Sequence, residues 1–370
     1  MTTHGTVIVL RFGATLRKAM RRSVPERVDA AFREGLTELT TPPTVFYVNL
    51  TERCQLACAH CITRAPETTA AGTARALSPA VLEALGPHLA HARYVGFTHS
   101  GEPLLSPALV PFLEALRGRR KGAPTVVHVI TNGMALTERR FLELCALGLC
   151  SWSFSLDGVT AQSNDALRLG AKVDVLMPRL TTLARLRREH ALDVRLGVSC
   201  TVTRSNLDEL EAMVRFVAGA GLDWLKLEET FPLNDRAKRE ADIPRAEFEA
   251  KVGAALRLAD SLRLTLVDHT RAHEVWKCDP PVMDAETSRF SRADDFANRL
   301  DINPCRGPWE VVCVEPDGEV KPGDFHQPAV GSLREQDLLS LWNAPAFVGR
   351  RRHALARRKC GGPPTCAAAL

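Results

Sequence analysis

The chain has 370 residues, and its 45% hydrophobic and 25% charged residues exclude a disordered, coiled-coil or collagen-like protein. Its 48 basic and 43 acidic residues leave a net charge of +5, too small a surplus for a dedicated nucleic-acid binder. The sequence shows neither a signal peptide nor a membrane-spanning apolar stretch, so we expect a cytoplasmic globular protein with no nucleic-acid or membrane partner. In that reducing setting, we expect the 11 cysteines to bind metal or do chemistry.

From residue 44 onward, short β-rich runs alternate with longer helical patterns. We predict six strands, at residues 44–50, 93–99, 125–131, 151–156, 194–202 and 223–229. Helices between them begin after Ser78, Ser106, Thr137 and Asn206, which are residue types that cap helix N-termini. Because ten or more helical residues separate the strands, they pair in parallel, and their carboxyl ends share the edge where α/β proteins bind ligands. We therefore predict an α/β fold in which residues 44–245 form a partial (β/α)6, TIM-like barrel.

Three other segments flank this predicted barrel. Residues 1–43 form a helical preamble, and residues 246–303 form a connecting region with one helix and a short strand at 265–270. From residue 304 the pattern indicates a hairpin that turns at Pro316-Asp317-Gly318, followed by a helix and two terminal cysteines. We predict a small, cysteine-containing α+β extension over residues 304–370.

The strongest chemical signal is TERCQLACAHC, which follows the first strand and places Cys54, Cys58 and Cys61 in a C-x3-C-x2-C arrangement. Three thiolates within eight residues can converge on one soft metal centre, as in iron–sulfur clusters. They supply three ligands to a cubane of four irons, so one iron stays open. A zinc knuckle is the alternative, but structural zinc needs a fourth ligand and only His60 lies nearby.

Three further motifs end the second, third and fourth predicted strands: SGEP at 100–103, ITNG at 130–133 and SLDG at 155–158. With the cysteine triad in front of them, they make most of residues 44–245 resemble the radical S-adenosylmethionine (SAM) superfamily. The resemblance implies a 4Fe–4S cluster whose open iron is chelated by S-adenosylmethionine. It also implies reductive cleavage of that molecule to a 5′-deoxyadenosyl radical, which abstracts a hydrogen atom from a substrate.

The resemblance further implies which residues contact this cofactor. Glu102 looks like the acidic residue that binds the methionine ammonium, and Ser155 and Arg168 look like partners of the ribose or the carboxylate. The full set of implied cofactor-binding residues is His60, Ser100, Gly101, Glu102, Thr131, Asn132, Gly133, Ser155, Asp157 and Arg168. Taken singly, Glu102 could cap a turn, and the Asn132-Gly133 and Asp157-Gly158 pairs could be ordinary turn dipeptides.

A second cysteine set lies in the C-terminal extension. Cys305 precedes the hairpin, and Cys360 and Cys366 lie close to the C-terminus, a layout that resembles the auxiliary-cluster extension called SPASM or its shorter form, twitch. That family has a cysteine five residues after the hairpin glycine, where this chain has Gly323. Cys313, Asp324 or His326 could replace it, the cluster could stay open for substrate, or no second cluster forms. Cys313 could equally be a core residue, as we expect for Cys145, Cys150, Cys200 and Cys278.

Acid–base candidates lie on the sixth predicted strand. Alternation puts Lys226 and Glu228 on one face and Glu229 on the other, and any of the three could move a substrate proton. The alternative is that these three residues only form salt bridges at the surface and move no substrate proton.

About 43 residues precede the first strand, too few for a domain that binds a leader peptide. We therefore expect a small-molecule substrate of specialised metabolism, such as a sugar, aminocyclitol or nucleoside, and dehydrogenation, epimerisation or decarboxylation as the outcome. Epimerisation or crosslinking of a ribosomal peptide is the alternative, and a non-enzymatic zinc or redox sensor is a remote one. The expected partner is a one-electron donor such as flavodoxin or ferredoxin.

Overall fold

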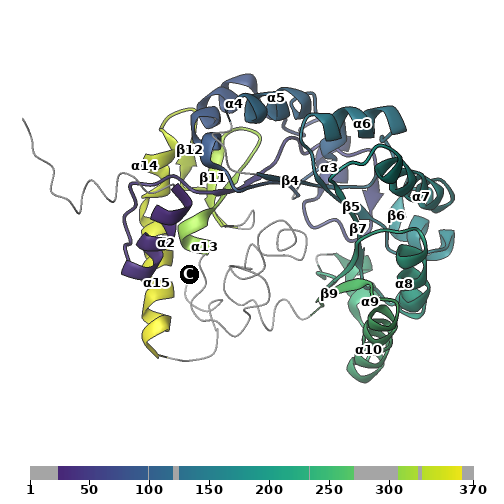
Figure 1. The fold of residues 1–370 in the computed structure, drawn as a ribbon. Coiled ribbons are helices and arrows are strands. Elements are labelled where there is room, and N and C mark those ends of the chain that lie inside the picture. Colours follow the sequence, from purple (N-terminus) through teal and green to yellow (C-terminus); the bar gives the residue numbers. More distant parts are fainter. Residues whose placement is uncertain are drawn as a thin grey trace, which may run out of the picture.

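The computed structural model describes residues 24–98, 100–119, 125–232, 234–270, 307–323 and 327–360. Its main feature is a curved ten-stranded sheet with the order β12-β11-β10-β1-β3-β4-β5-β7-β8-β9 (Figure 1). Parallel neighbours in this sheet are β10 (Val311–Val314), β1 (Val45–Val48), β3 (Tyr94–Phe97), β4 (Val126–Thr131), β5 (Ser151–Ser155), β7 (Arg195–Thr201), β8 (Trp224–Glu228) and β9 (Thr265–His269). Two strands, β11 (Glu319–Pro322) and β12 (Gly331–Ser332), continue one edge in antiparallel pairing.

All six predicted strands are present, which confirms the α/β fold with a mostly parallel sheet. The sheet extends beyond them at both edges. β9 pairs with β8, and β10 pairs in parallel with β1, with Val45 opposite Val311. The predicted C-terminal hairpin, formed by β10 and β11, therefore joins the strand that leads into the cysteine motif.

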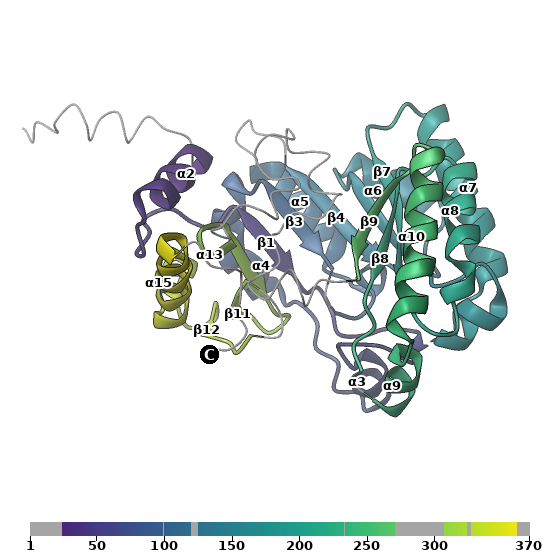
Figure 2. The ribbon, with the colours of Figure 1, turned by 90° about the horizontal axis from the view of Figure 1, so that it is seen from below.

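Helices cover the convex side of the sheet (Figures 1 and 2). Those on this side are α4 (Pro79–Leu85), α5 (Leu109–Arg119), α6 (Glu138–Ala146), α7 (Val173–Glu189), α8 (Leu210–Gly219) and α10 (Arg245–Ser261). The others are α2 (Val24–Glu34), α3 (Ala65–Ala70), α9 (Asp235–Ala241), α13 (Gly307–Glu310), α14 (Leu338–Trp342) and α15 (Pro345–Cys360). Within the described residues, no helix combines the length and apolar character needed to cross a membrane.

Strand alternation separates an apolar outer face from a polar inner face, as β5 illustrates. Trp152 and Phe154 are fully buried in the main hydrophobic core, whose burial contributes roughly 1.5–3 kcal/mol for each large side chain. The serines of β5, at 151, 153 and 155, alternate with these two residues and so lie on the opposite, concave face of the sheet. There Ser153 Oγ lies 2.7 Å from Ser199 Oγ of β7. The concave face of the sheet thus supplies hydrogen-bonding groups close to the carboxyl ends of the parallel strands.

The helix starts follow the predicted caps in most cases. Ser78 and Thr137 accept hydrogen bonds from the backbone N–H three residues later, at 3.3 and 3.2 Å. Ser106 accepts one from the N–H two residues later, just before α5. A short 3-10 helix, Leu207–Glu209, begins directly after Asn206, as predicted, but the Asn206 side chain makes no capping hydrogen bond. Its side-chain amide instead donates 2.6 Å to the Asp157 carbonyl oxygen, because this polar group is buried and needs a local partner.

The C-terminal helix α15 is attached through Arg351, which is fully buried. Its guanidinium donates hydrogen bonds of 2.9 Å to the carbonyl oxygens of Thr37, Pro308 and Trp342. It also lies 4.5 Å from the centre of the Trp342 ring. Burial lowers the pKa of Arg351 to about 9. One side chain therefore ties α15 to the segments that contain Thr37, Pro308 and Trp342.

Candidate active site

The cysteine motif lies on a loop whose base is held by two neighbouring segments. Backbone hydrogen bonds of 2.9 Å tie residues 50–52 to residues 75–77. From the next strand, Gly101 packs directly against the chain entering the loop. Its φ of +58° favours glycine, and a Cβ there would lie 2.4 Å from the Thr51 oxygen and 2.6 Å from the Arg53 oxygen. The glycine of SGEP is thus needed for close backbone approach.

The three cysteines are free thiols that line a single cavity of about 450 Å³. Burial, with smaller contributions from the nearby Glu102, Cys58 and Cys61, raises the pKa of Cys54 to about 12. Such thiols are neutral until a bound metal displaces their protons. The cavity therefore offers the soft donor set and the space that a cluster needs.

Zinc and an iron–sulfur cluster make different geometric demands on the three cysteines. Within the described part of the chain, no three His, Cys, Asp or Glu side chains converge so as to hold a single metal ion. A tetrahedral zinc ion would need all its ligands about 2.0–2.3 Å from one point. In a cubane each thiolate binds a different iron, so the sulfur atoms lie further apart. The donor set fits the cluster.

Glu102, in the SGEP motif that follows β3, is 1% exposed and accepts three hydrogen bonds. Thr131 Oγ1 donates at 2.7 Å, Asn132 N–H at 2.8 Å and Leu104 N–H at 3.0 Å. Burial raises the pKa of Glu102, and these hydrogen bonds oppose that rise. No ion pair among the described residues includes this carboxylate, although it lines the cavity. A buried carboxylate facing a cavity without a cation fits the ammonium of S-adenosylmethionine.

An ion pair between Asp157 and Arg168 supports the other side of the cysteine loop. β2 (Ala57–Cys58) pairs with β6 (Arg168–Leu169), so that Cys58 lies opposite Arg168. The Arg168 Nε atom lies 2.6 Å from Asp157 Oδ2, and His60 Nε2 lies 3.2 Å from the same oxygen. Burial works against the charge of Asp157, but Arg168 and His60 hold its pKa well below the usual value. His60 Nδ1 is buried and has no hydrogen-bond partner among the described residues.

The cavity brings together most of the predicted site residues. Those that line it are Cys54, Cys58, His60, Cys61, Ser100, Gly101, Glu102, Thr131, Asn132, Ser155, Arg168, Lys226, Glu228 and Glu229. Gly133 and Asp157 lie behind this lining. Gly133 has a φ of +71° and donates its N–H to Thr131 Oγ1 at 3.0 Å, and Asp157 is fully buried. These two support neighbours that reach the cavity.

The end of β8 forms the wall away from the cysteines. Lys226 Nζ lies 2.9 Å from Glu228 Oε1, so the two share a face as predicted. Burial raises the pKa of Glu228, but Lys226 and His269 outweigh that effect and the net shift is downward. Glu229, which we expected on the other face, lines the same cavity. The strand ends at Glu228, so strict alternation no longer applies to the next residue.

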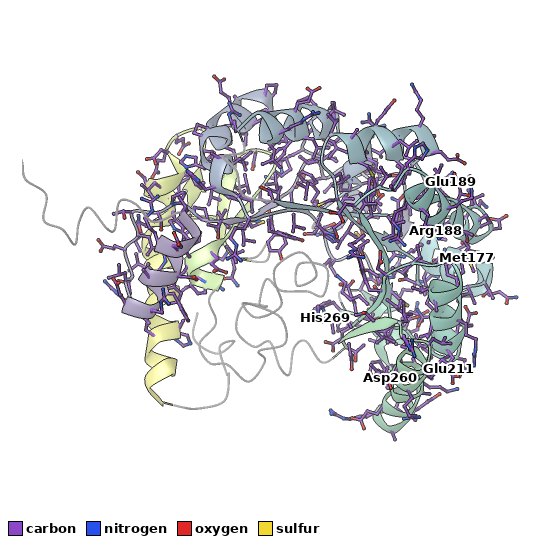
Figure 3. All side chains as sticks on the ribbon, viewed as in Figure 1. Met177, Arg188, Glu189, Glu211, Asp260 and His269 are labelled. Atoms are coloured by element: carbon purple, nitrogen blue, oxygen red, sulfur yellow. The ribbon has the colours of Figure 1, made fainter. Side chains whose placement is uncertain are left out.

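Sequence reasoning missed several lining residues, including Tyr47, Phe231 and His269. His269 ends β9 in register with Glu228. It projects toward the concave side, whereas Arg188, Glu189, Glu211 and Asp260 lie on the outer helices (Figure 3). The strand-end rule that found SGEP, ITNG and SLDG could have found His269, because its strand also follows a helix.

The second cysteine set is only partly within the described residues. Cys305 and Cys366 lie outside them, as do Asp324 and His326, and Cys360 is the last residue of α15. Cys313 is fully buried in β10, between Tyr47 of β1 and Lys321 of β11. Its role as a ligand stays a prediction. Gly323, at the usual cysteine position, lines the same cavity as the first three cysteines.

Comparisons with known proteins agree with this geometry. The family model of the radical SAM superfamily matches residues 48–217, and that of SPASM, an iron–sulfur cluster-binding domain, matches residues 305–367. Pre-heme d1 synthase of Dinoroseobacter shibae is 28% identical over 337 residues, which cover 87% of this chain and 79% of that relative. PqqA peptide cyclase of Ruegeria pomeroyi is 30% identical over 191 residues, which cover 50% of this chain and 46% of that one.

The fold comparison points the same way. SuiB of Streptococcus suis, solved bound to its precursor peptide SuiA, superimposes with a TM-score of 0.63 at 14% identity, covering 94% of this chain and 74% of SuiB. At that identity the likeness concerns the fold alone. The two family matches together span more than half of the chain, and they bring a 4Fe–4S cluster and S-adenosylmethionine as cofactors. The chain is therefore an enzyme of the radical SAM superfamily with a C-terminal SPASM domain.

Proposed function

We propose that this enzyme abstracts a hydrogen atom from a small-molecule substrate bound between the cysteine loop and the end of β8. The observation that carries the proposal is the shared cavity. The cysteines and Glu102 line one side of it, and Lys226, Glu228 and Phe231 line another. Cofactor and substrate would thus meet in one space of about 450 Å³. Holding one C–H bond close and keeping water away is the protein's main contribution to such chemistry.

Several residues are suited to hold the cofactors. Cys54, Cys58 and Cys61 would ligate three irons, and Glu102 would accept the methionine ammonium of S-adenosylmethionine. The bound pair would supply the 5′-deoxyadenosyl radical. Ser155 and Arg168 would bind its ribose or carboxylate, with Arg168 oriented by its ion pair with Asp157.

We assign different roles to the three acid–base candidates, Lys226, Glu228 and Glu229. Because Lys226 lowers the pKa of Glu228, that carboxylate holds a proton weakly and is a poor base. We assign substrate binding to the Lys226–Glu228 pair. Glu229, at the same wall, is then the candidate that removes a proton from a substrate alcohol or ammonium.

The substrate class is supported by a relative that matches most of the chain. That relative is named for haem d1 synthesis, whereas the peptide cyclase matches half of this chain. We therefore favour a small molecule of the cofactor-precursor type, such as a tetrapyrrole with carboxylate side chains, ahead of a sugar, aminocyclitol or nucleoside. A peptide substrate is the second candidate, which the PqqA peptide cyclase match supports.

We also propose a cytoplasmic setting and a flavodoxin or ferredoxin as the electron donor. A second cluster held by Cys305, Cys360 and Cys366 would leave one position without a protein thiolate, since Gly323 has no side chain. Such a cluster could anchor the substrate or accept an electron from it. An iron and sulfide count on a variant with all three of Cys54, Cys58 and Cys61 changed to alanine tests this. About four irons remaining in this variant would support a second cluster, whereas an iron count of zero would exclude it.

The central proposal is tested with the full chain, reconstituted anaerobically and reduced with dithionite. Release of 5′-deoxyadenosine and the masses of products are measured with carboxylated tetrapyrroles, sugars, aminocyclitols, nucleosides and candidate peptides. Faster release with a small molecule, together with a product of changed mass, is expected. The same response to a peptide alone would replace the proposal with the peptide alternative. No release under any condition, with stoichiometric zinc bound, would favour a sensor.

A further inference from the structure

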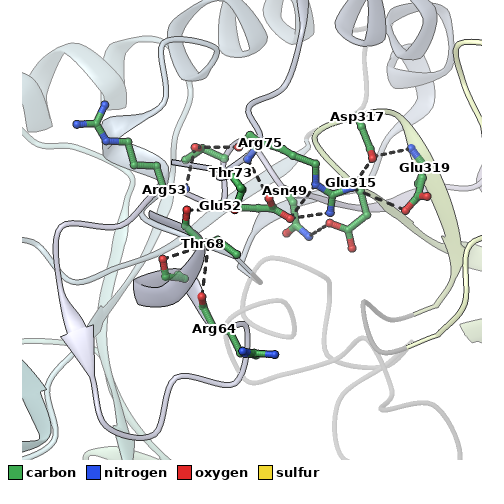
Figure 4. A network of polar contacts seen from close by, with 12 residues as sticks. Asn49, Glu52, Arg53, Arg64, Thr68, Thr73, Arg75, Glu315, Asp317 and Glu319 are labelled. Atoms are coloured by element: carbon green, nitrogen blue, oxygen red, sulfur yellow. Dashed lines mark hydrogen bonds and ion pairs between the residues drawn. The ribbon is translucent and has the colours of Figure 1, made fainter. Parts of the chain in front are cut away.

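Arg75 connects two segments that are far apart in the sequence (Figure 4). Its Nε and Nη2 atoms donate to Glu52 Oε1 at 3.0 and 2.6 Å, and its backbone N–H donates to Glu52 Oε2 at 2.8 Å. Its Nη1 atom pairs with Asp317 in the turn between β10 and β11, and lies 4.0 Å from Glu319 Oε2. One guanidinium therefore joins the cysteine loop to a hairpin 242 residues later.

Each end of this connection adjoins the cavity. Glu52 lies two residues before Cys54, and its own N–H donates 2.9 Å to the Arg75 carbonyl oxygen. On the other side, Asp317 lies in the turn two residues before β11, and β11 leads to Gly323, which lines the cavity together with Cys54. The contacts of Arg75 therefore affect the distance between the cavity wall that contains Cys54 and the wall that contains Gly323.

A second contact reinforces the same junction. Asn49, at the end of β1, donates from its side chain to Glu315 Oε2 at 2.7 Å. The other oxygen of Glu315 lies 2.7 Å from Lys321 Nζ, on the returning strand of the hairpin. This contact holds the residue that opens the hairpin turn, while Arg75 holds Asp317 within the turn.

The charges explain why the guanidinium matters beyond its hydrogen bonds. Glu52 and Asp317 are both paired with this one guanidinium, so their like charges lie close together. Without Arg75 the carboxylates would repel one another across the junction. A lysine could not replace it fully, because an ammonium lacks the planar fork that contacts two carboxylates at once.

We propose that Arg75 is a positioning residue that holds the C-terminal hairpin against the cysteine loop and so sets the shape of the cavity between Cys54 and Gly323. Its importance for catalysis rests on the proposed function. The mechanical link itself does not, and it can be measured in the chain without cofactors.

Hydrogen exchange of the full, cofactor-free chain tests the link. In Arg75→Met, amides of residues 50–56 and 315–323 should exchange roughly fivefold faster, a change of the size found for coupled contacting groups. Asp317→Asn should also accelerate residues 50–56, because the described contacts of Asp317 are with Arg75 and Glu319 only. In the double variant that carries both Arg75→Met and Asp317→Asn, amides of residues 50–56 should exchange no faster than in Arg75→Met alone. The matched control is Arg185→Met, which removes an exposed Arg–Glu pair within α7.

Two results would overturn the link. One is an unchanged cysteine loop in Asp317→Asn, and the other is equal acceleration throughout the chain in Arg75→Met and Arg185→Met. Either would mean that Arg75 has no role in connecting these two segments.

The consequence for the site is measured by electron paramagnetic resonance of the reduced, reconstituted chain. The S-adenosylmethionine concentration that gives half of the spectral change should rise roughly threefold or more in Arg75→Met and Asp317→Asn, and not in Arg185→Met. Arg75→Lys should recover part of the loss. An unchanged midpoint in both site variants would refute the positioning role. A wild-type chain that shows no response would instead refute the proposed function, while the exchange result still decides the link.

Discussion

Substitution of Gly101 by alanine isolates the contact between SGEP and the cysteine loop. Gly101 and Gly72 both have a positive φ, +58° and +68°, so alanine is strained at either position. A Cβ at Gly72 meets no heavy atom within 4 Å, whereas at Gly101 it meets the backbone that enters the loop. Gly72→Ala is therefore a matched control that shares the backbone strain and lacks the clash.

The expected magnitudes follow from this difference. A left-handed conformation costs an L-residue about 1–2 kcal/mol, and Gly72→Ala should lose only that much stability. In Gly101→Ala the Thr51 oxygen, 2.4 Å from the new Cβ, must retreat by about 1.0 Å to reach the ordinary van der Waals distance of 3.4 Å. Overpacking of this kind adds about 1–3 kcal/mol, so a total loss of about 2–5 kcal/mol is expected. The displaced backbone lies just before Cys54, so cluster binding should also suffer.

Thermal unfolding of the cofactor-free chain and the iron content after reconstitution measure the two effects. Gly72→Ala should lower the melting temperature by a few degrees and keep the wild-type iron content. Gly101→Ala should melt at a lower temperature than Gly72→Ala and retain little iron or S-adenosylmethionine cleavage. Equal melting temperatures and equal iron in the two variants would refute the reasoning, because the clash would then have no effect.

The remaining predictions concern the ion pair beside the cluster and the cysteines themselves. Asp157→Asn should destabilise the chain by about 3–5 kcal/mol in urea unfolding, because it leaves the buried charge of Arg168 uncompensated; a loss below about 1 kcal/mol would contradict this. The Asp157 pKa is lowered in the folded state, so its contribution is complete above about pH 4 and falls away below it. The difference between wild type and Asp157→Asn should therefore be constant from pH 6 to 8 and shrink in acid. Cys58→Ala should abolish release of 5′-deoxyadenosine, whereas Cys145→Ala, far from the cavity lining, should preserve it; equal loss would mean that the ligand set is wrong.

Much of the fold follows from local pattern. Each predicted strand is a run of alternating or apolar residues, and each intervening helix is long enough to require a parallel return. The site follows in part for the same reason. The three cysteines lie within eight residues, and the motifs around Glu102 and Asn132 end successive strands, so parallel pairing brings them to one edge.

Side-chain partners across the fold could not be predicted in this way. Periodicity assigns Lys226 and Glu228 to one face, but it stops at the end of the strand, and Glu229 therefore lines the cavity against expectation. The pairing of Asp157 with Arg168 depends on the short β2–β6 contact, which no propensity indicates.

The sequence by itself determined the succession of strands along the chain, the spacing of the three cysteines and the motifs that follow the strands, because each depends on residues close in sequence. Only the tertiary structure decided that the C-terminal hairpin joins β1 and that Arg75 meets Asp317. It also placed His269 and Gly323 at the same cavity as Cys54. Such contacts depend on the register and curvature of the whole sheet, which are set by the packing of many distant side chains together and not by any one segment.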